Sequence, residues 1–469
     1  MADVLVLGAG MAGLSTALLL ARDGHRVTVL ERDGAPPPAD PEQAWSDWDR
    51  RGVNQFRMPH YMLSRWRQVM QRELPDVLTQ LRACGAAALN PLTYMLPKHT
   101  GGWWDGDERF GTVTARRPVL EWVLAGAAED QPGVTLRRGV AVRAVRTGTP
   151  TRPGVPHVVG VNTESGAHIP ADLVVDATGR RSRIPALLAA AGARPGIEHR
   201  EDCGFVYLTR HFRARGGGGT PDGVAALVQD YAGLTILTLP SDNHTWSVSF
   251  VVAARDKALR TLRELPAWCA ALRLFPLAAH WADGAPISGV DVMAGIEDRI
   301  RRYVTAEGPT VTGLLSVGDA WACTNPSLGR GTSIGLLHAC ALRDLLHCSD
   351  VDQPAELTRR WDELTSTEVE PLYRVTLDYD RHRLAEIDAN RAGRVYRTDD
   401  PTWTSTKALA AAARRHPEAL RGVMDISSLL ATLPEVLARP GMTDRLDPAA
   451  ESRPLPGPDR AGLLAAIAG

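Results

Sequence analysis

The stretch that decides the fold is DVLVLGAGMAG, residues 3–13. Residues 3–7 are apolar after the aspartate and predict a short buried strand, and apolar spacing after the glycines predicts a helix. Residues 25–30 predict a second, β-branched strand that ends at Glu31. A strand, a glycine turn, a helix, a strand and an acid in this order are typical of a Rossmann unit that binds a dinucleotide.

The small residues of the turn each have a physical task. Gly8 permits the tight turn, Gly10 lets the backbone approach a pyrophosphate, and Gly13 lets the helix pack closely on the strand. The helix begins at Met11 and Ala12, and its free N–H groups and dipole favour the phosphates.

The acid after the second strand indicates which nucleotide fits. Glu31 is expected to accept hydrogen bonds from the ribose hydroxyls, and Arg32 next to it belongs to the same candidate site. A carboxylate there disfavours a 2′-phosphate, which argues against NADP. NAD and FAD both remain open on this motif alone.

Two later motifs also join a buried strand to a glycine turn. The first is DATGRRSRIP, residues 176–185, and the second is GDAWACTNPSLGRGTSIG, residues 318–335, which opens an apolar helix. With these motifs the chain resembles the FAD-dependent monooxygenases of the para-hydroxybenzoate hydroxylase structural class. In motif style it is most similar to polyether and squalene epoxidases and to two-component flavin monooxygenases. The resemblance covers roughly residues 1–345.

The resemblance implies the cofactor contacts. In that family the aspartate of the GD motif binds a ribityl hydroxyl, which maps to Asp319 after Gly318, and the following backbone binds the flavin ring and the pyrophosphate. The remaining expected contacts are Asp176, Gly179, Gly329, Arg330, Gly331 and Thr332. A second helix N-terminus facing negative charge agrees with this mapping.

Two further residues each have two possible roles. Arg117 matches the family's R-x-x-L-E-x-x-L helix start and is either a flavin contact or a surface arginine beside a proline. Pro326 matches a proline beside the flavin, whose carbonyl would take part in catalysis, or else fixes the turn.

Weaker candidates lie elsewhere in the chain. Arg57 and His60 occupy a stretch that epoxidase-like sequences place near the flavin, and His338 is either close to the flavin ring or buried in the core. Trp103 and Trp104 either line an apolar pocket or pack in the core.

Departures from the family bear on the source of electrons. Aromatic hydroxylases carry A-D-G-x-x-S-x-x-R, where this chain has Thr178 for the aspartate and Pro185 for the final arginine. That motif serves both FAD and the nicotinamide, so NADH or NADPH is expected to reduce the flavin either directly or through a separate flavin reductase. The halogenase motif G-W-x-W-x-I-P is absent, and Lys98 is the only lysine before position 257.

Composition excludes several classes of function. A net charge of −1 offers no basic field for nucleic acid or an anionic membrane, and no apolar run is long enough for a membrane span. The six cysteines form no metal-ligand spacing, so we expect reduced thiols, no metal and a cytoplasmic protein. The oligomeric state stays unknown.

The order of the motifs predicts an α/β fold with a discontinuous FAD-binding domain. Residues 1–195, with excursions toward the substrate near 50–115, and residues 296–345 form the Rossmann-type FAD-binding part. Residues 196–295 form an inserted antiparallel substrate sheet, with strands expected at 205–212, 224–228, 234–239 and 246–252. Residues 346–469 form a C-terminal helical region with a docked proline-rich tail at 454–458.

The predicted function is FAD-dependent oxygenation of a small organic substrate. The resemblance implies that one oxygen atom from O2 enters an apolar or aromatic, natural-product-like molecule through a C4a-hydroperoxyflavin, by epoxidation or hydroxylation. The alternatives are a flavin-dependent reductase of the geranylgeranyl reductase type, a flavin-dependent halogenase and a non-catalytic flavoprotein.

Overall fold

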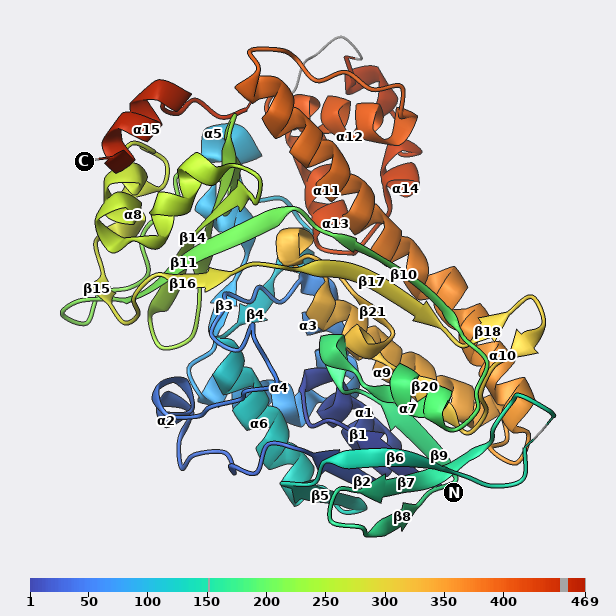
Figure 1. The fold of residues 1–469 in the computed structure, drawn as a ribbon. Coiled ribbons are helices and arrows are strands. Elements are labelled where there is room, and N and C mark those ends of the chain that lie inside the picture. The colour runs from blue at the N-terminus through green and yellow to red at the C-terminus, as the bar shows by residue number, and fades with distance from the viewer. Residues whose placement is uncertain (151, 448–453, 469) are drawn as a thin grey trace.

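A five-stranded parallel sheet lies at one end of the molecule, in the order β20-β9-β1-β2-β5 (Figure 1). The computed structural model describes residues 1–150, 152–447 and 454–468. The five strands are β1 (Asp3–Leu7), β2 (Arg26–Glu31), β5 (Val134–Arg138), β9 (Leu173–Asp176) and β20 (Leu314–Ser316). All four pairings are parallel, as a Rossmann-type unit requires.

Both faces of this sheet are covered, which explains the apolar strand sequences. Val4 and Val6 of β1 face a core built with α1 (Met11–Arg22), α6 (Arg117–Asp130) and α9 (Gly331–Cys348). Leu5 and Leu7 face the opposite core, because neighbouring side chains of a strand alternate between faces. That second core includes β6 (Val142–Thr147), β7 (Val158–Thr163), β8 (His168–Pro170) and α7 (Ile184–Ala190).

An antiparallel sheet forms the second layer, in the order β12-β13-β14-β11-β15, with β16 also pairing with β11. Its strands are β11 (Phe205–Arg213), β12 (Val228–Asp230), β13 (Leu234–Pro240), β14 (Thr245–Ala253), β15 (Ala285–Pro286) and β16 (Asp291–Met293). Three of the four expected strands are present within a residue or two. The strand expected over 224–228 is wrong except at its end, because β12 begins only at Val228. Before it, Leu227 still bonds to the sheet through its carbonyl, which accepts from the N–H of Thr238 at 2.9 Å.

A three-stranded antiparallel sheet links the two layers. It consists of β10 (Ile197–Asp202), β17 (Glu297–Arg302) and β21 (Ala322–Cys323). The remaining helices and strands before residue 345 are α2 (Pro41–Ser46), α3 (Ser64–Glu73), α4 (Pro75–Ala83), α5 (Pro97–Thr100), α8 (Leu265–Leu272), β3 (Ala87–Leu89), β4 (Thr112–Thr114), β18 (Val304–Thr305) and β19 (Gly308–Pro309).

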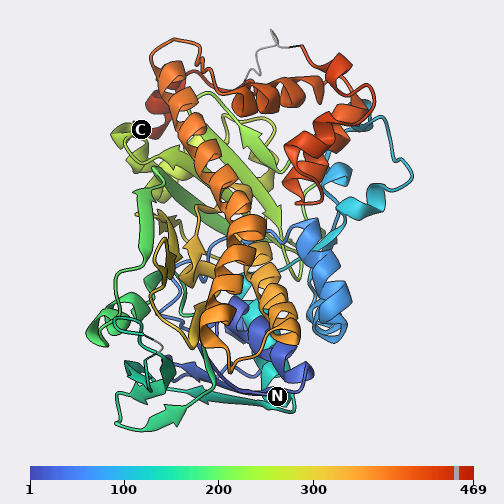
Figure 2. The same ribbon diagram turned by 90° about the vertical axis from the view of Figure 1, so that its right-hand side faces the viewer.

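Helices follow residue 350, and α11 (Glu370–Arg391) runs along the molecule from the parallel sheet toward the other end (Figure 2). The others are α10 (Pro354–Leu364), α12 (Pro401–Ala412), α13 (Pro417–Ser427), α14 (Leu433–Leu437) and α15 (Arg460–Ala468). The proline-rich segment lies against the antiparallel sheet, where the N–H of Leu455 donates to the carbonyl of Asp230 at 2.8 Å. Helix α15 then packs on α8.

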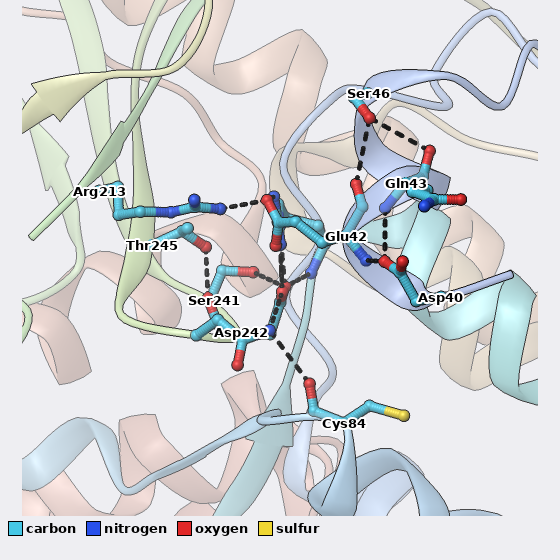
Figure 3. A network of polar contacts seen from close by, with 11 residues as sticks. Asp40, Glu42, Gln43, Ser46, Cys84, Arg213, Ser241, Asp242 and Thr245 are labelled. Carbon is cyan, nitrogen blue, oxygen red and sulfur yellow. Dashed lines mark hydrogen bonds and ion pairs between the residues drawn. The ribbon is translucent and has the colours of Figure 1, made fainter. Parts of the chain in front are cut away.

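A buried ion network fastens the antiparallel sheet to the Rossmann unit (Figure 3). Asp242, in the turn between β13 and β14, is fully buried and accepts hydrogen bonds from the backbone N–H and the guanidinium of Arg116, the shortest at 2.6 Å. Arg116 directly precedes α6 and also donates to Glu42 of α2 at 2.7 Å. Arg213 of β11 pairs with Glu42 as well. Three elements far apart in sequence therefore meet at one guanidinium.

We expect Asp242→Asn to lower the free energy of unfolding by about 3–5 kcal/mol, because it leaves the buried Arg116 guanidinium without its main counter-charge. Glu42→Gln is the matched control: Glu42 is about half exposed, so its loss is expected to stay below about 1 kcal/mol. Urea unfolding of both variants measures the difference. If both variants lost the same free energy of unfolding, the Arg116–Asp242 pair would not be the main link between the two layers.

Candidate functional site

A groove of about 450 Å³ lies at the carboxyl ends of β1, β2, β9 and β20, where open α/β sheets bind their ligands. Most of the residues that the motifs predicted line it. They are Gly8, Gly10, Met11, Ala12, Glu31, Arg32, Arg117, Gly179, Gly318, Asp319, Pro326, Gly329, Gly331 and Thr332. The structure thus brings together segments that are separated by more than three hundred residues, from Gly8 to Thr332.

The turn before α1 shows why its glycines differ in their tasks. Gly8 has φ +102°, and a Cβ there would lie 2.7 Å from the carbonyl oxygen of Ala177. A Cβ on Gly13 would lie 2.0 Å from the carbonyl oxygen of Gly8, so Gly13 serves packing and does not line the groove. A Cβ on Gly10 would meet no described atom within 4 Å, and no side chain caps α1. Gly10 therefore leaves open space in front of a helix N-terminus.

The turn after β20 is fixed by a hydrogen bond to His338 of α9. The backbone N–H of Gly318 donates to Nδ1 of His338 at 2.9 Å, and burial lowers the pKa of this imidazole to about 3. The ring is therefore neutral, with its proton on Nε2, which has no partner among the described residues. His338 lines neither of the cavities described here and positions the Gly318–Asp319 turn instead.

A chain of charged side chains lies along the groove at the end of β2. Arg50 donates to Glu31 and to Glu121, each at 2.8 Å, and Arg117 donates to Glu121 at 2.7 Å. Nη1 of Arg117 lies 3.1 Å from Nε2 of His60. Burial and the charge of Arg117 lower the pKa of His60 to about 3, so His60 is a neutral acceptor here. Arg50 belongs to none of the motifs and was missed for that reason.

Several polar groups of the groove fit a dinucleotide. Of about four lone-pair sites on the Glu31 carboxylate, the N–H groups of Ala9, Asp33 and Arg50 occupy three, which leaves one for a ribose hydroxyl. Nε and Nη1 of Arg180 and the hydroxyl of Thr332 are buried in the groove wall without a partner among the described residues. A cation and two uncapped helix N-termini suit a pyrophosphate, so the residues present fit FAD. Arg180 was missed because nothing near it in the sequence indicates that its guanidinium lacks a partner.

Other predicted residues lie away from the groove. Asp176 accepts hydrogen bonds from Thr178 and Ser182 and shapes the turn after β9 without lining the groove. Arg57 donates to the carbonyls of Ser46 and Trp48 and also stays outside the groove. Of the paired tryptophans, Trp103 is 57% exposed and Trp104 stacks on the Arg421 guanidinium. Neither tryptophan lines a described cavity.

A second cavity, of about 1560 Å³, opens beside the groove. Both spaces are lined by Tyr61, Leu237, Leu239, Pro326 and Gly329, so they meet at the turn before α9. The walls come from the antiparallel sheet, α11, α12 and α13, and are rich in leucine, valine and methionine.

The loop after α11 closes one side of this cavity. Nδ1 and Nε2 of His382 each lie 2.9 Å from an oxygen, of Tyr396 and Asp400 respectively. Since Tyr396 lines the cavity, these two contacts fix the loop as part of its wall.

The described residues contain neither a metal site nor a helix that could span a membrane. No group of three or more histidine, cysteine or acidic side chains is arranged to hold a metal ion. Within the same residues, no helix has both the length and the apolar character needed to cross a bilayer.

We expect Gly10→Val to fold normally yet bind FAD at least about 100-fold more weakly, because a Cβ at this position meets no protein atom and the side chain fills the space before α1. Gly126→Val in α6 is the control, since its side chain also meets open space but lies outside the groove. Titration of the apoprotein with FAD, with thermal unfolding alongside, measures both effects. Unchanged FAD affinity in the Gly10 variant would remove this groove as the site.

We expect His338→Leu to lose about 1–3 kcal/mol of stability and to bind FAD more weakly, because the buried N–H of Gly318 loses its acceptor. His338→Asn keeps an acceptor oxygen close to the position of Nδ1 and should recover most of both losses. Thermal unfolding and FAD titration of the two variants test this. Equal defects in both would show that the ring acts by volume alone.

Comparison with known proteins agrees with this geometry. A family model described as FAD dependent oxidoreductase matches residues 3–40. Protein Rv3254 of Mycobacterium tuberculosis (strain ATCC 25618 / H37Rv) is 28% identical over 389 residues, which cover 78% of each chain. PqsL, a probable FAD-dependent monooxygenase from Pseudomonas aeruginosa, superposes with a TM-score of 0.60 at 18% identity, over 84% of this chain and 98% of its own. CmlS, a flavin-dependent halogenase, superposes with a TM-score of 0.59 at 16% identity, over 92% of this chain and 76% of its own. The chain therefore has the fold of flavin-dependent monooxygenases, and the resemblance noted in the sequence is confirmed at that level.

Proposed function

We propose that this protein is an FAD-dependent monooxygenase that inserts one oxygen atom from O2 into a small apolar or aromatic molecule. The observation that carries this proposal is the junction of two spaces at Pro326 and Gly329. The groove on one side fits FAD, and the cavity on the other side has room for an organic substrate of considerable size.

The residues of the chain would position the reactants. The N-termini of α1 and α9, with Arg180, would hold the pyrophosphate, and Glu31 would hold the adenosine ribose. Leu237 and Leu239 line the junction and would exclude water from the reacting centre. FAD, when bound, would supply the oxygen-activating chemistry, and the protein would supply orientation. No acid–base pair is needed at the junction for this role.

The electron source is part of the proposal. Thr178 lines the groove where aromatic hydroxylases carry an aspartate, and Pro185 lies in the first turn of α7. These substitutions favour reduction by a separate flavin reductase over direct reduction by NADH or NADPH.

The halogenase alternative is weaker because of Lys98. This residue is exposed and lines neither cavity, whereas halogenases of the tryptophan type use an early lysine in catalysis. A flavin-dependent reductase would form its product without O2, whereas a monooxygenase requires O2.

We expect the FAD-loaded protein, reduced with dithionite under anoxia and then mixed with isotopically labelled O2, to place one labelled atom in a product. A panel of aromatic acids and apolar arenes serves as substrate, and it includes 2-aminobenzoylacetate, the compound bound in one PqsL structure. NADH, NADPH and a flavin reductase are compared as electron donors in parallel. Product formation without O2, or an unlabelled product, would overturn the proposal.

A further inference from the structure

Arg330 is a buried cation without a counter-charge. It follows Gly329 at the start of α9 and is 5% exposed. Nη1 donates to the carbonyl of Leu372 at 3.2 Å, and Nε has no hydrogen-bond partner in the described part of the chain. Among the described residues, no carboxylate oxygen lies within 4.0 Å of its guanidinium. Arg330 lines the larger cavity and not the FAD groove.

Among the described residues, the other arginines that are buried as whole residues are paired with acids. Arg180, which has two nitrogens without a partner among the same residues, is only partly buried and lines the FAD groove instead. Arg50 pairs with Glu31 and Glu121, and Arg116 pairs with Asp242. Arg421 likewise pairs with the buried Asp107 at 2.6 Å. Because an unpaired buried charge is strongly unfavourable, the exception at Arg330 indicates a ligand that supplies the missing anion.

The protonation state of Arg330 also indicates an anionic ligand. Burial lowers the pKa of its guanidinium to about 10, so the group still carries its positive charge at neutral pH. A neutral ligand would leave that charge unpaired. An oxyanion would offset it with charge-assisted hydrogen bonds.

The surroundings define the shape of the ligand. Leu63, Leu328 and Met424 line the same cavity and present apolar surface, and Ser427 and Ser428 add hydroxyl groups. Gly329, which precedes Arg330, belongs to both spaces. An anion on Arg330 would therefore be held at the end of the cavity nearest the groove.

We propose that Arg330 binds an oxyanion of the substrate, so that this protein acts on organic acids with a large apolar body. The inference rests on the proposed function and narrows its substrate class. The acidic group, a carboxylate or an ionised enol or phenol, anchors one end beside the junction, and the apolar body extends between the antiparallel sheet and α11–α13.

The test compares 2-naphthoate with its neutral isostere 2-naphthamide on the FAD-loaded protein, by isothermal titration calorimetry under anoxia. We expect the protein to bind the acid at least tenfold more tightly than the amide, and Arg330→Met to abolish that preference. Lys407→Met is the matched control, because Lys407 lines the same cavity but is already paired with Glu386 at 2.7 Å. Arg330→Gln replaces Arg330→Met if the latter does not fold, as judged by circular dichroism and FAD content.

Equal affinity of the native protein for acid and amide overturns the inference. So does a preference that survives in the Arg330 variant. If the preference survives and the Arg330 variant also shifts the reduction potential of bound FAD, the partner of Arg330 is the flavin and not the substrate. Because binding is measured without O2, a failure of oxygen transfer with the preference intact counts against the proposed function alone.

Discussion

The close approach of α1 and α9 is the constraint on which the site depends. A Cβ added to Gly335 of α9 would lie 3.3 Å from the Cβ of Ala12 in α1, and one added to Gly318, in the turn after β20, would lie 2.9 Å from the same atom. Only small side chains therefore let the two helices begin side by side at one edge of the parallel sheet. Two helix N-termini then converge on one groove, which a single Rossmann turn cannot achieve. Larger residues at these positions would separate the helices and divide the groove.

Buried arginines determine how the remaining elements are placed around this pair of helices. Arg50 joins the loop after α2 to the end of β2 and to α6, and Arg116 joins α6 to the antiparallel sheet. Such pairs add little net stability over an apolar core, but breaking one is costly, so they favour one arrangement over others. The junction between groove and cavity depends on that arrangement because one wall comes from each layer.

The sequence allowed the fold class and most of the groove to be predicted, since the glycine motifs are local patterns with a defined place after a strand. Gly8, Gly318 and Gly331 lie where their motifs predict. The long-range partners could not be predicted: nothing near Arg50 or Arg180 in the sequence indicates a pairing or its absence. Asp176 illustrates the opposite limit, since its motif is local yet its carboxylate faces the turn and not the groove. Residues 224–227 have the composition of a strand, yet β12 begins only at Val228, because tertiary context overrides a weak propensity.

The construction of the groove from distant segments has a consequence for the level of this protein in a cell. Its walls come from residues near 10, 31, 50, 117, 180 and 318–335, which meet only in the folded chain. A dinucleotide held there binds the native state alone and stabilises it by mass action, by about 2.7 kcal/mol when its free concentration is 100 times the dissociation constant. That amount is a large share of the total stability of an ordinary domain. The abundance of this protein would therefore follow the supply of flavin, since the cofactor-free chain opens more often and is degraded faster.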